Sequence, residues 1–138
     1  MADSTTEIST ALLTLLLADV GVSAIVGNSV FDTNVPEGVT PPWVRFYTAG
    51  ESSENVFQRK TPVHNRNVVS IDGAAVKKAD AKSLIAAIMA ACDGTSLSMT
   101  AWKGSLGRTA PARKAWDDTA KHWVMSADYL IVTTGKKE

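Results

Sequence analysis

This 138-residue sequence contains a single cysteine, Cys92, so no disulfide can form within the chain. No Asn-x-Ser/Thr glycosylation acceptor occurs, and Asp3 and Glu7 stand where a secretory signal would carry Lys or Arg. The most apolar stretches, residues 11–18 and 84–92, fall far short of the roughly 20 residues that span a bilayer. We therefore expect a soluble protein of a reducing compartment, with no membrane partner.

Net charge is missing as well, since 14 Lys and Arg balance 14 Asp and Glu. That balance excludes a protein that coats nucleic acid through its overall charge. A content of 45% hydrophobic and 20% charged residues excludes a disordered chain and predicts one folded domain over residues 1–138. The charges are nevertheless uneven: residues 1–57 carry seven acids and one base, and residues 58–138 carry thirteen bases and seven acids. The two parts either neutralise each other in space or form an acidic and a basic surface.

Two main helices are predicted from capping signals and apolar spacing. Ser4 followed by Glu7 forms a capping box, and apolar residues at steps of three and four continue a helix that should exit through Gly21: Ile8, Leu12, Leu15 and Leu16. Residues 22–26 predict one or two further helical turns. The second main helix runs from residue 78 or 80 to 91 and ends at Asp93-Gly94.

The segments between and after these helices predict strands. Residues 29–31, 43–48, 66–72 (ended by Gly73) and 122–132 have β-branched and aromatic content, and residues 95–102 alternate apolar and polar side chains. The fold class is α+β, with a mainly antiparallel sheet of four to five strands and two main helices packed on one face. Residues 49–65 form a long flexible loop or hairpin excursion between central strands, and residues 135–138 a frayed tail.

Residue constellations that carry catalysis or metal binding are scarce. His64 and His122 have no second ligand at metal spacing, so neither predicts a zinc site. Cys92 ends an Ala-rich helix before Asp93, whose charge would raise the thiol pKa, and is expected to be a small core residue. Adjacent acids at 117–118 are more typical of a solvated turn than of a metal site. We expect no enzyme, no metal and no cofactor.

Basic residues do gather near tryptophans in the last third of the chain, as in a single-strand nucleic-acid groove: Arg108, Arg113, Lys114 and Lys121, beside Trp102 and Trp116. The acids at 117–118 lie inside this cluster, and a sequence pI near 6.7 lacks the general basic character of a nucleic-acid binder. The sequence thus predicts non-specific proximity to DNA at most.

The layout of the chain resembles the tail-terminator or tail-completion proteins of long-tailed bacteriophages, a family that also occurs in phage-like particles. The resemblance rests on the N-terminal amphipathic helix, residues 18–31 (ADVGVSAIVGNSVF), the Pro-rich loop into Pro42-Trp43-Val44-Arg45-Phe46, the strand at 66–72, the helix ending in Cys92-Asp93-Gly94, and Asp117-Asp118 before a long last strand. One departure is Gly73-Ala74-Ala75, where the family usually carries an aromatic residue and an Ala.

The resemblance implies a virion protein, assembled in the host bacterial cytoplasm. Its members form a ring, usually of six copies, that caps the tail tube, stops its growth and contacts the head-side connector or neck protein. Since a head-to-tail ring uses two different patches on each copy, an acidic patch facing a basic one would set the register. The candidate interface residues are Glu51, Glu54, Phe57, Arg59, Lys60, Arg108, Arg113 and Lys114.

Within this set, Phe57 is the expected anchor, because a lone aromatic among polar residues either folds back onto its own sheet or inserts into a partner. Reversing the charges of Arg59 and Lys60 should weaken ring formation. Two alternatives stay open: a head-completion or neck protein of the same interface, and a monomeric ligand-binding α+β domain, which would have a closed apolar pocket.

Overall fold

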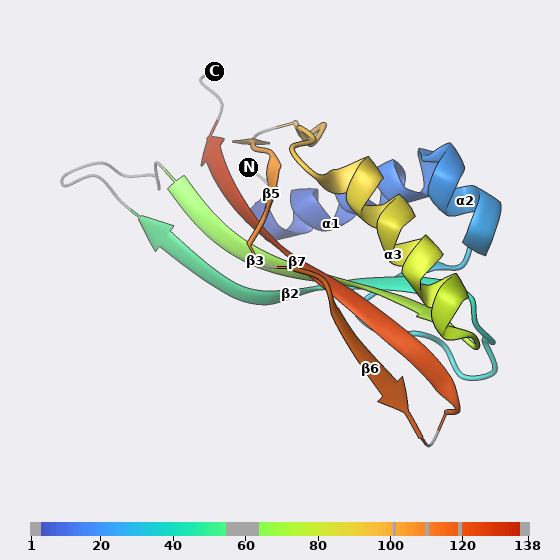
Figure 1. Cartoon of the computed structure of the whole chain (residues 1–138). Helices are drawn as coiled ribbons and strands as arrows, with labels where there is room; N and C mark the ends of the chain where they lie inside the picture. The colour runs from blue at the N-terminus through green and yellow to red at the C-terminus, as the bar shows by residue number, and fades with distance from the viewer. Residues whose placement is uncertain (1–3, 55–63, 101, 110, 119, 136–138) are drawn as a thin grey trace.

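Three helices and seven strands form the part of the chain that the computed structural model describes, namely residues 4–54, 64–100, 102–109, 111–118 and 120–135 (Figure 1). In chain order they are α1 (Ser4–Ala18), α2 (Val20–Val26), β1 (Val30–Asp32), β2 (Trp43–Glu54), β3 (His64–Ala75), α3 (Lys78–Cys92), β4 (Trp102–Lys103), β5 (Leu106–Arg108), β6 (Arg113–Asp117) and β7 (His122–Gly135).

The two N-terminal helices follow the predicted apolar stripe, with Ile8, Leu12 and Leu16 buried in the core. The predicted exit at Gly21 is wrong, because this glycine lies inside α2. The chain turns instead at Asp19, whose carboxylate accepts the Val22 N–H at 3.0 Å and caps α2. The left-handed residue is Gly27, with φ +62°, at the end of α2.

The sheet confirms the mainly antiparallel prediction and is larger than expected. Its strand order is β1-β2-β3-β7-β4, and β5 and β6 also pair with β7; β1 alone runs parallel to its neighbour, β2. The basic run at 108–114 was not predicted as a strand, yet β6 begins within it at Arg113. β6 is too short to show an alternation of apolar and polar residues, so its sequence does not mark it as a strand. Its pairing with β7 fixes it as one.

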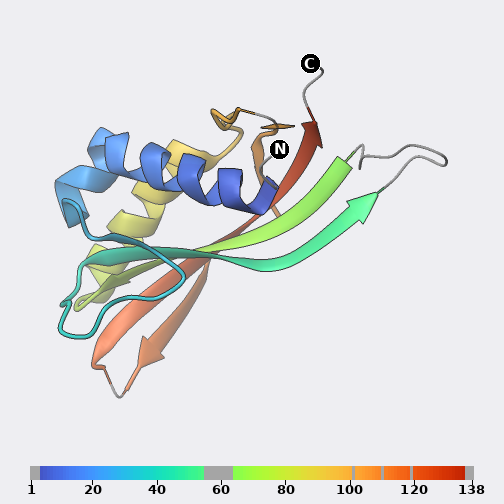
Figure 2. The ribbon, with the colours of Figure 1, turned by 180° about the vertical axis from the view of Figure 1, so that it is seen from behind.

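The central strands are longer than predicted. β2 continues to Glu54 and β3 begins at His64, so 49–54 and 64–65 of the predicted loop are strand, while 55–63 lie outside the described residues. The two strands stay paired from Trp43↔Ala74 to Glu54↔His64, with a register shift between Thr48 and Gly50. Their far ends reach past the helices (Figure 1, Figure 2).

The predicted strand end at Gly73 is also wrong, since β3 runs on to Ala75. The reason for a glycine here is the helix above it: a Cβ on Gly73 would lie 2.9 Å from Leu84 Cγ and 3.2 Å from Ile88 Cδ1. The missing side chain lets α3 approach the sheet closely.

Residues 95–100 alternate in burial without forming a strand. Leu97 and Met99 are buried and the polar residues between them are exposed. The backbone pairs with the sheet region at the Ser96↔Ser105 bridge and through two hydrogen bonds of 2.9 Å, from Leu106 N–H to the Thr95 carbonyl and from Leu97 N–H to the Gly104 carbonyl. The segment is also held to α1, because the Glu7 carboxylate accepts the Thr100 N–H at 2.6 Å.

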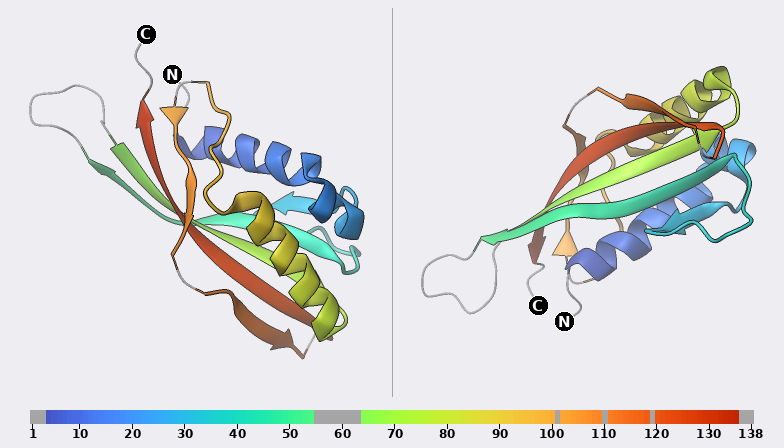
Figure 3. Two further views of the ribbon diagram at one scale, coloured as in Figure 1. Left: turned by 45° about the horizontal axis from the view of Figure 1, so that its top comes forward. Right: turned by 90° about the horizontal axis from the view of Figure 1, so that it is seen from below.

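All three helices lie on one side of the twisted sheet (Figure 3), as predicted. The core between them is built from α1 and α3 residues and from the helix-facing residues of β2, β3 and β7, such as Phe46, Ile71 and Tyr129. No helix of the described residues lies on the other face of the sheet.

No single helix in the described part of the chain is long and apolar enough to cross a membrane. α1 and α2 together pass on length and composition, but they are bent by 79° at their junction.

Candidate assembly interface

The structure divides the candidate interface residues into three groups. Glu51 and Glu54 lie in the second half of β2. Phe57, Arg59 and Lys60 lie outside the described residues, so their roles stay predictions. Arg108, Arg113 and Lys114 come from β5 and β6, on the opposite side of the sheet from β2.

Arg108 is occupied within its own subunit. Its guanidinium contacts Met89 Sδ and lies 3.5 Å from Asp93 Oδ2, both near the end of α3. Asp93 in turn accepts the Tyr129 hydroxyl at 2.6 Å. Arg108 therefore ties α3 to the sheet, and its role in contact with another copy stays a prediction.

Arg113 and Lys114 lie on the edge strand β6. Arg113 pairs with Asp128 at 2.9 Å, although 62% of its side chain is exposed. Lys114 is exposed and lies beside Lys78 at the start of α3. Lys114 lowers the pKa of Lys78, mainly because the two side chains share a hydrogen bond and also because both are positively charged. The charge of Lys82 lowers the pKa of Lys78 further. The fold thus brings like charges together next to β6.

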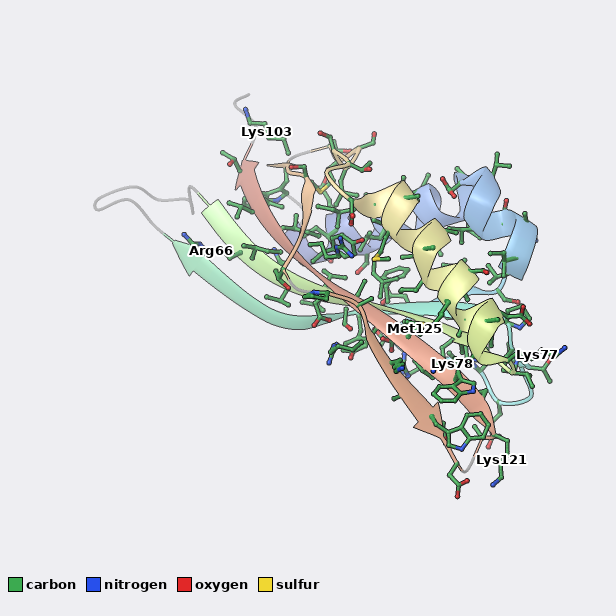
Figure 4. The ribbon with its side chains drawn as sticks, viewed as in Figure 1. Arg66, Lys77, Lys78, Lys103, Lys121 and Met125 are labelled. Carbon is green, nitrogen blue, oxygen red and sulfur yellow. The ribbon has the colours of Figure 1, made fainter. Side chains whose placement is uncertain are left out.

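Trp116, which the sequence places beside the basic cluster, lies at the surface on β6, a strand that the sequence did not predict. It is 44% exposed on β6 and contacts Trp123 at a ring distance of 5.2 Å. Lys78 Nζ lies 5.5 Å from the Trp123 ring (Figure 4). Trp43 and Trp102 are buried, with exposed fractions of 6% and 5%.

Each of the two outer edges of the sheet has one half that is paired with other backbone and one half that is free among the described residues. On the first side, β1 covers the beginning of β2, and its last contact is the Thr33 N–H on the Phe46 carbonyl at 2.8 Å. From Tyr47 to Glu54 no described residue forms a strand beside β2. We call the outer side of Tyr47–Glu54 the β2 edge.

On the second side, residues 94–95 cover β5 through two backbone hydrogen bonds, from Gly94 to Leu106 at 2.8 Å and from Leu106 to Thr95 at 2.9 Å. β6 pairs with β7 on its inner side and has no strand beside its outer side among the described residues. We call that outer side the β6 edge.

The helix-free face of the sheet is sealed by its own side chains. Asp72 is buried, and it accepts hydrogen bonds from Arg45 Nε at 3.2 Å and from the Ser126 hydroxyl at 2.6 Å. The Arg45 guanidinium lies over the rings of Trp43 and Tyr47 at 5.7 and 5.5 Å. On this face the buried Asp72 carboxylate is thus satisfied by Arg45 and Ser126.

Metal and nucleophile chemistry finds little support in the described residues. They contain no group of three His, Cys, Asp or Glu side chains that could hold a metal ion. Cys92 is fully buried, and burial, with the nearby charges of Asp93 and then Asp19, raises its thiol pKa to about 12. Asp117 and Asp118 form the predicted turn, where they bond the Ala120 N–H and the Lys121 ammonium.

The family profile described as "Tail completion protein gp17" matches residues 10–132 of this chain. Because this match spans most of the sequence, the chain belongs to that family. It is a structural protein of the bacteriophage tail and a component of the virion.

The fold recurs in solved structures. A chain of the "Virion of native gene transfer agent (GTA) particle" is 18% identical, with a TM-score of 0.75, and the alignment covers 98% of this chain and 100% of that one. A second solved chain is 12% identical, with a TM-score of 0.66, and the alignment covers 99% of this chain and 100% of that one. A search of curated protein sequences found no match.

Proposed function

We propose that this protein assembles as a ring, of six copies, on the finished tail tube, where it stops tube growth and presents a surface to the head-side connector. The observation that carries the proposal is the tail-completion family match over residues 10–132. Completing a tail requires contact with the tube protein on one face and with the neck on the other, and DNA passes close by.

The similar chain from the gene transfer agent virion supports a place within a particle, because the likeness spans nearly the whole of both chains. Nothing large has been added to or removed from the common fold. A protein of this size therefore performs its task by contacting copies of itself and its neighbours through the shared α+β unit.

The two free strand edges also support a ring. Head-to-tail assembly needs two different surfaces on each copy, whereas a two-fold dimer needs one surface that matches itself. The β2 edge and the β6 edge lie on opposite sides of one sheet, which is the arrangement that a closed head-to-tail ring uses.

Electron microscopy of particles assembled without this protein tests the proposal. Overlong tails without heads are expected if the protein terminates the tube. Normal tails with leaky heads would instead assign it to head completion, and normal virions would rule out both roles. Supplying the wild-type gene in trans is the control, and it should restore tails of normal length.

A monomeric ligand-binding domain is the competing function. It calls for a closed apolar pocket, whereas a hollow of about 490 Å³ among the described residues is open to solvent and lined by polar side chains: Ser9, Asp32, Thr33, Arg45, Tyr47 and Thr48. Light scattering of the purified protein separates the two functions, because a sharply monomeric mass at all concentrations favours ligand binding.

A further inference from the structure

An exposed strand edge is a template for pairing with another chain, and natural proteins usually cover such edges. This protein covers half of each side of its sheet, with β1 on one side and residues 94–95 on the other. The halves left free lie at opposite ends of the strands. The β2 edge corresponds to the β7 residues from Asp128 onward, and β6 pairs with His122 to Ser126.

The directions of the strands allow the β6 edge of one copy and the β2 edge of another to pair in the antiparallel arrangement. β2 is antiparallel to β3, β3 to β7, and β7 to β6, so β6 runs opposite to β2 within one copy. Neighbouring copies in a ring of about six are turned by only about 60°, which largely preserves strand direction. A β6 edge docked on the next copy's β2 edge would therefore form an antiparallel ladder, with the helices of both copies on the same side.

The charges of the two edges are complementary. The β2 edge carries Glu51 and Glu54 and no base. The β6 edge carries Arg113 and Lys114, with Lys78 beside it (Figure 4), and one acid, Asp117. Carboxylates from a neighbour would relieve the repulsion between Lys78 and Lys114, whose ammonium groups lie next to each other.

Given the ring of the proposed function, we propose that its copies join by strand addition, with the β6 edge of one copy pairing with the β2 edge of the next. The occupant of each free edge is thus a second copy of this chain. Trp116, 44% exposed on β6, is the side chain that this pairing covers. A partly exposed tryptophan within a basic edge is typical of the residues that contribute most to binding.

Cysteine cross-linking tests the pairing directly, because the native Cys92 is fully buried and gives little background. Ala115→Cys is combined with Ser52→Cys in one variant and with Ser53→Cys in another. Adjacent strand residues point to opposite faces, so one combination is expected to give a ladder of disulfide-linked oligomers and the other much less. Each single variant is the matched control and should give no ladder.

Charge reversal supplies an independent readout. Lys114→Glu is expected to weaken self-association at least about tenfold, and Glu54→Lys in the same chain should restore it to within about threefold of wild type. Thermal stability should not fall, because a glutamate beside Lys78 replaces repulsion with attraction. Lys103→Glu, an equal charge change on β4, is the control and should leave self-association unchanged.

The outcomes distinguish the strand-addition inference from the ring function. If the wild-type protein forms rings but neither cysteine pair cross-links, the inference is wrong and the ring stands. Disulfide dimers from Ala115→Cys alone would show two β6 edges meeting, which also overturns the inference. If the protein neither self-associates nor is needed for tails of normal length, the proposed function itself fails.

Discussion

The hydroxyl of Tyr129 donates a hydrogen bond of 2.6 Å to Asp93 Oδ1, which joins the middle of β7 to the end of α3. Tyr129 is fully buried, and Arg108 lies 3.5 Å from the other oxygen of the same carboxylate. A single acid at the helix end thus connects the two structural layers of the protein. Arg108 is part of this connection through its contact with Asp93.

Tyr129→Phe should therefore destabilise the protein by about 1–2 kcal/mol, since it removes a buried hydrogen bond to a charged group while leaving the ring in place. Urea unfolding followed by circular dichroism measures the loss. Tyr47→Phe is the matched control: Tyr47 is only partly buried, and its ring contact with Arg45 survives the change. Equal stability of Tyr129→Phe and wild type would contradict the expected contribution.

Alkaline pH should lower stability because of Cys92. Its thiol pKa is raised from 9.0 to about 12, chiefly by burial and then by the charges of Asp93 and Asp19. Between these values the unfolded chain loses a proton that the folded chain keeps, so stability is complete below about pH 9 and falls as the pH rises towards 12. The expected slope is about 1.4 kcal/mol per pH unit.

Urea unfolding at pH 8, 9, 10 and 11 measures this dependence. Cys92→Ala is the control, and it should have a shallower slope because the ionising group is gone. The pKa of Tyr129 is also raised, by burial first and then by its hydrogen bond to Asp93, so a smaller decline should persist in both proteins. Identical slopes would mean that Cys92 does not contribute.

Gly73→Ala should destabilise the protein by about 1–3 kcal/mol, because the added methyl group would overlap Leu84 and push α3 away from the sheet. Gly107→Ala is a suitable control, since its nearest neighbour would lie 3.8 Å away. Thermal unfolding of both variants provides the measurement. A Gly73→Ala protein as stable as the control would show that α3 shifts without cost.

Asp72→Asn should cost about 2 kcal/mol, because it leaves the Arg45 guanidinium without its charged partner on the helix-free face. The substitution keeps the size of the side chain and an acceptor for the Ser126 hydroxyl. Asp118→Asn, at a side chain that is 85% exposed, is expected to change stability little. Guanidinium unfolding compares the two, and losses of equal size would argue against a special role for the buried pair.

Apolar periodicity predicted the helices and the long strands because their burial requires it. The stripe through Ile8, Leu12 and Leu16 faces the core as expected, and in β7 the alternate residues up to Ile131 are buried. The short strands β4, β5 and β6 could not be predicted in this way. They are too short to show a period and exist because β7 supplies their hydrogen-bond partners.

For Gly73 and for the basic residues, too, the sequence predicted part of the result and the fold decided the rest. The sequence identified Gly73 as a punctuation point, and only the packed α3 shows that it serves close contact. The sequence grouped Arg108, Arg113 and Lys114 as one basic cluster, and the fold separates them. Arg108 points to the end of α3, whereas the other two lie on β6.

The sequence by itself determined the α+β class, the buried faces of the main elements and the acidic and basic parts of the chain, because these follow from local pattern and composition. Only the tertiary structure decided which backbone groups find partners. Strand pairing is a relation between distant residues, so the covered and free halves of the sheet edges follow from the folded topology alone.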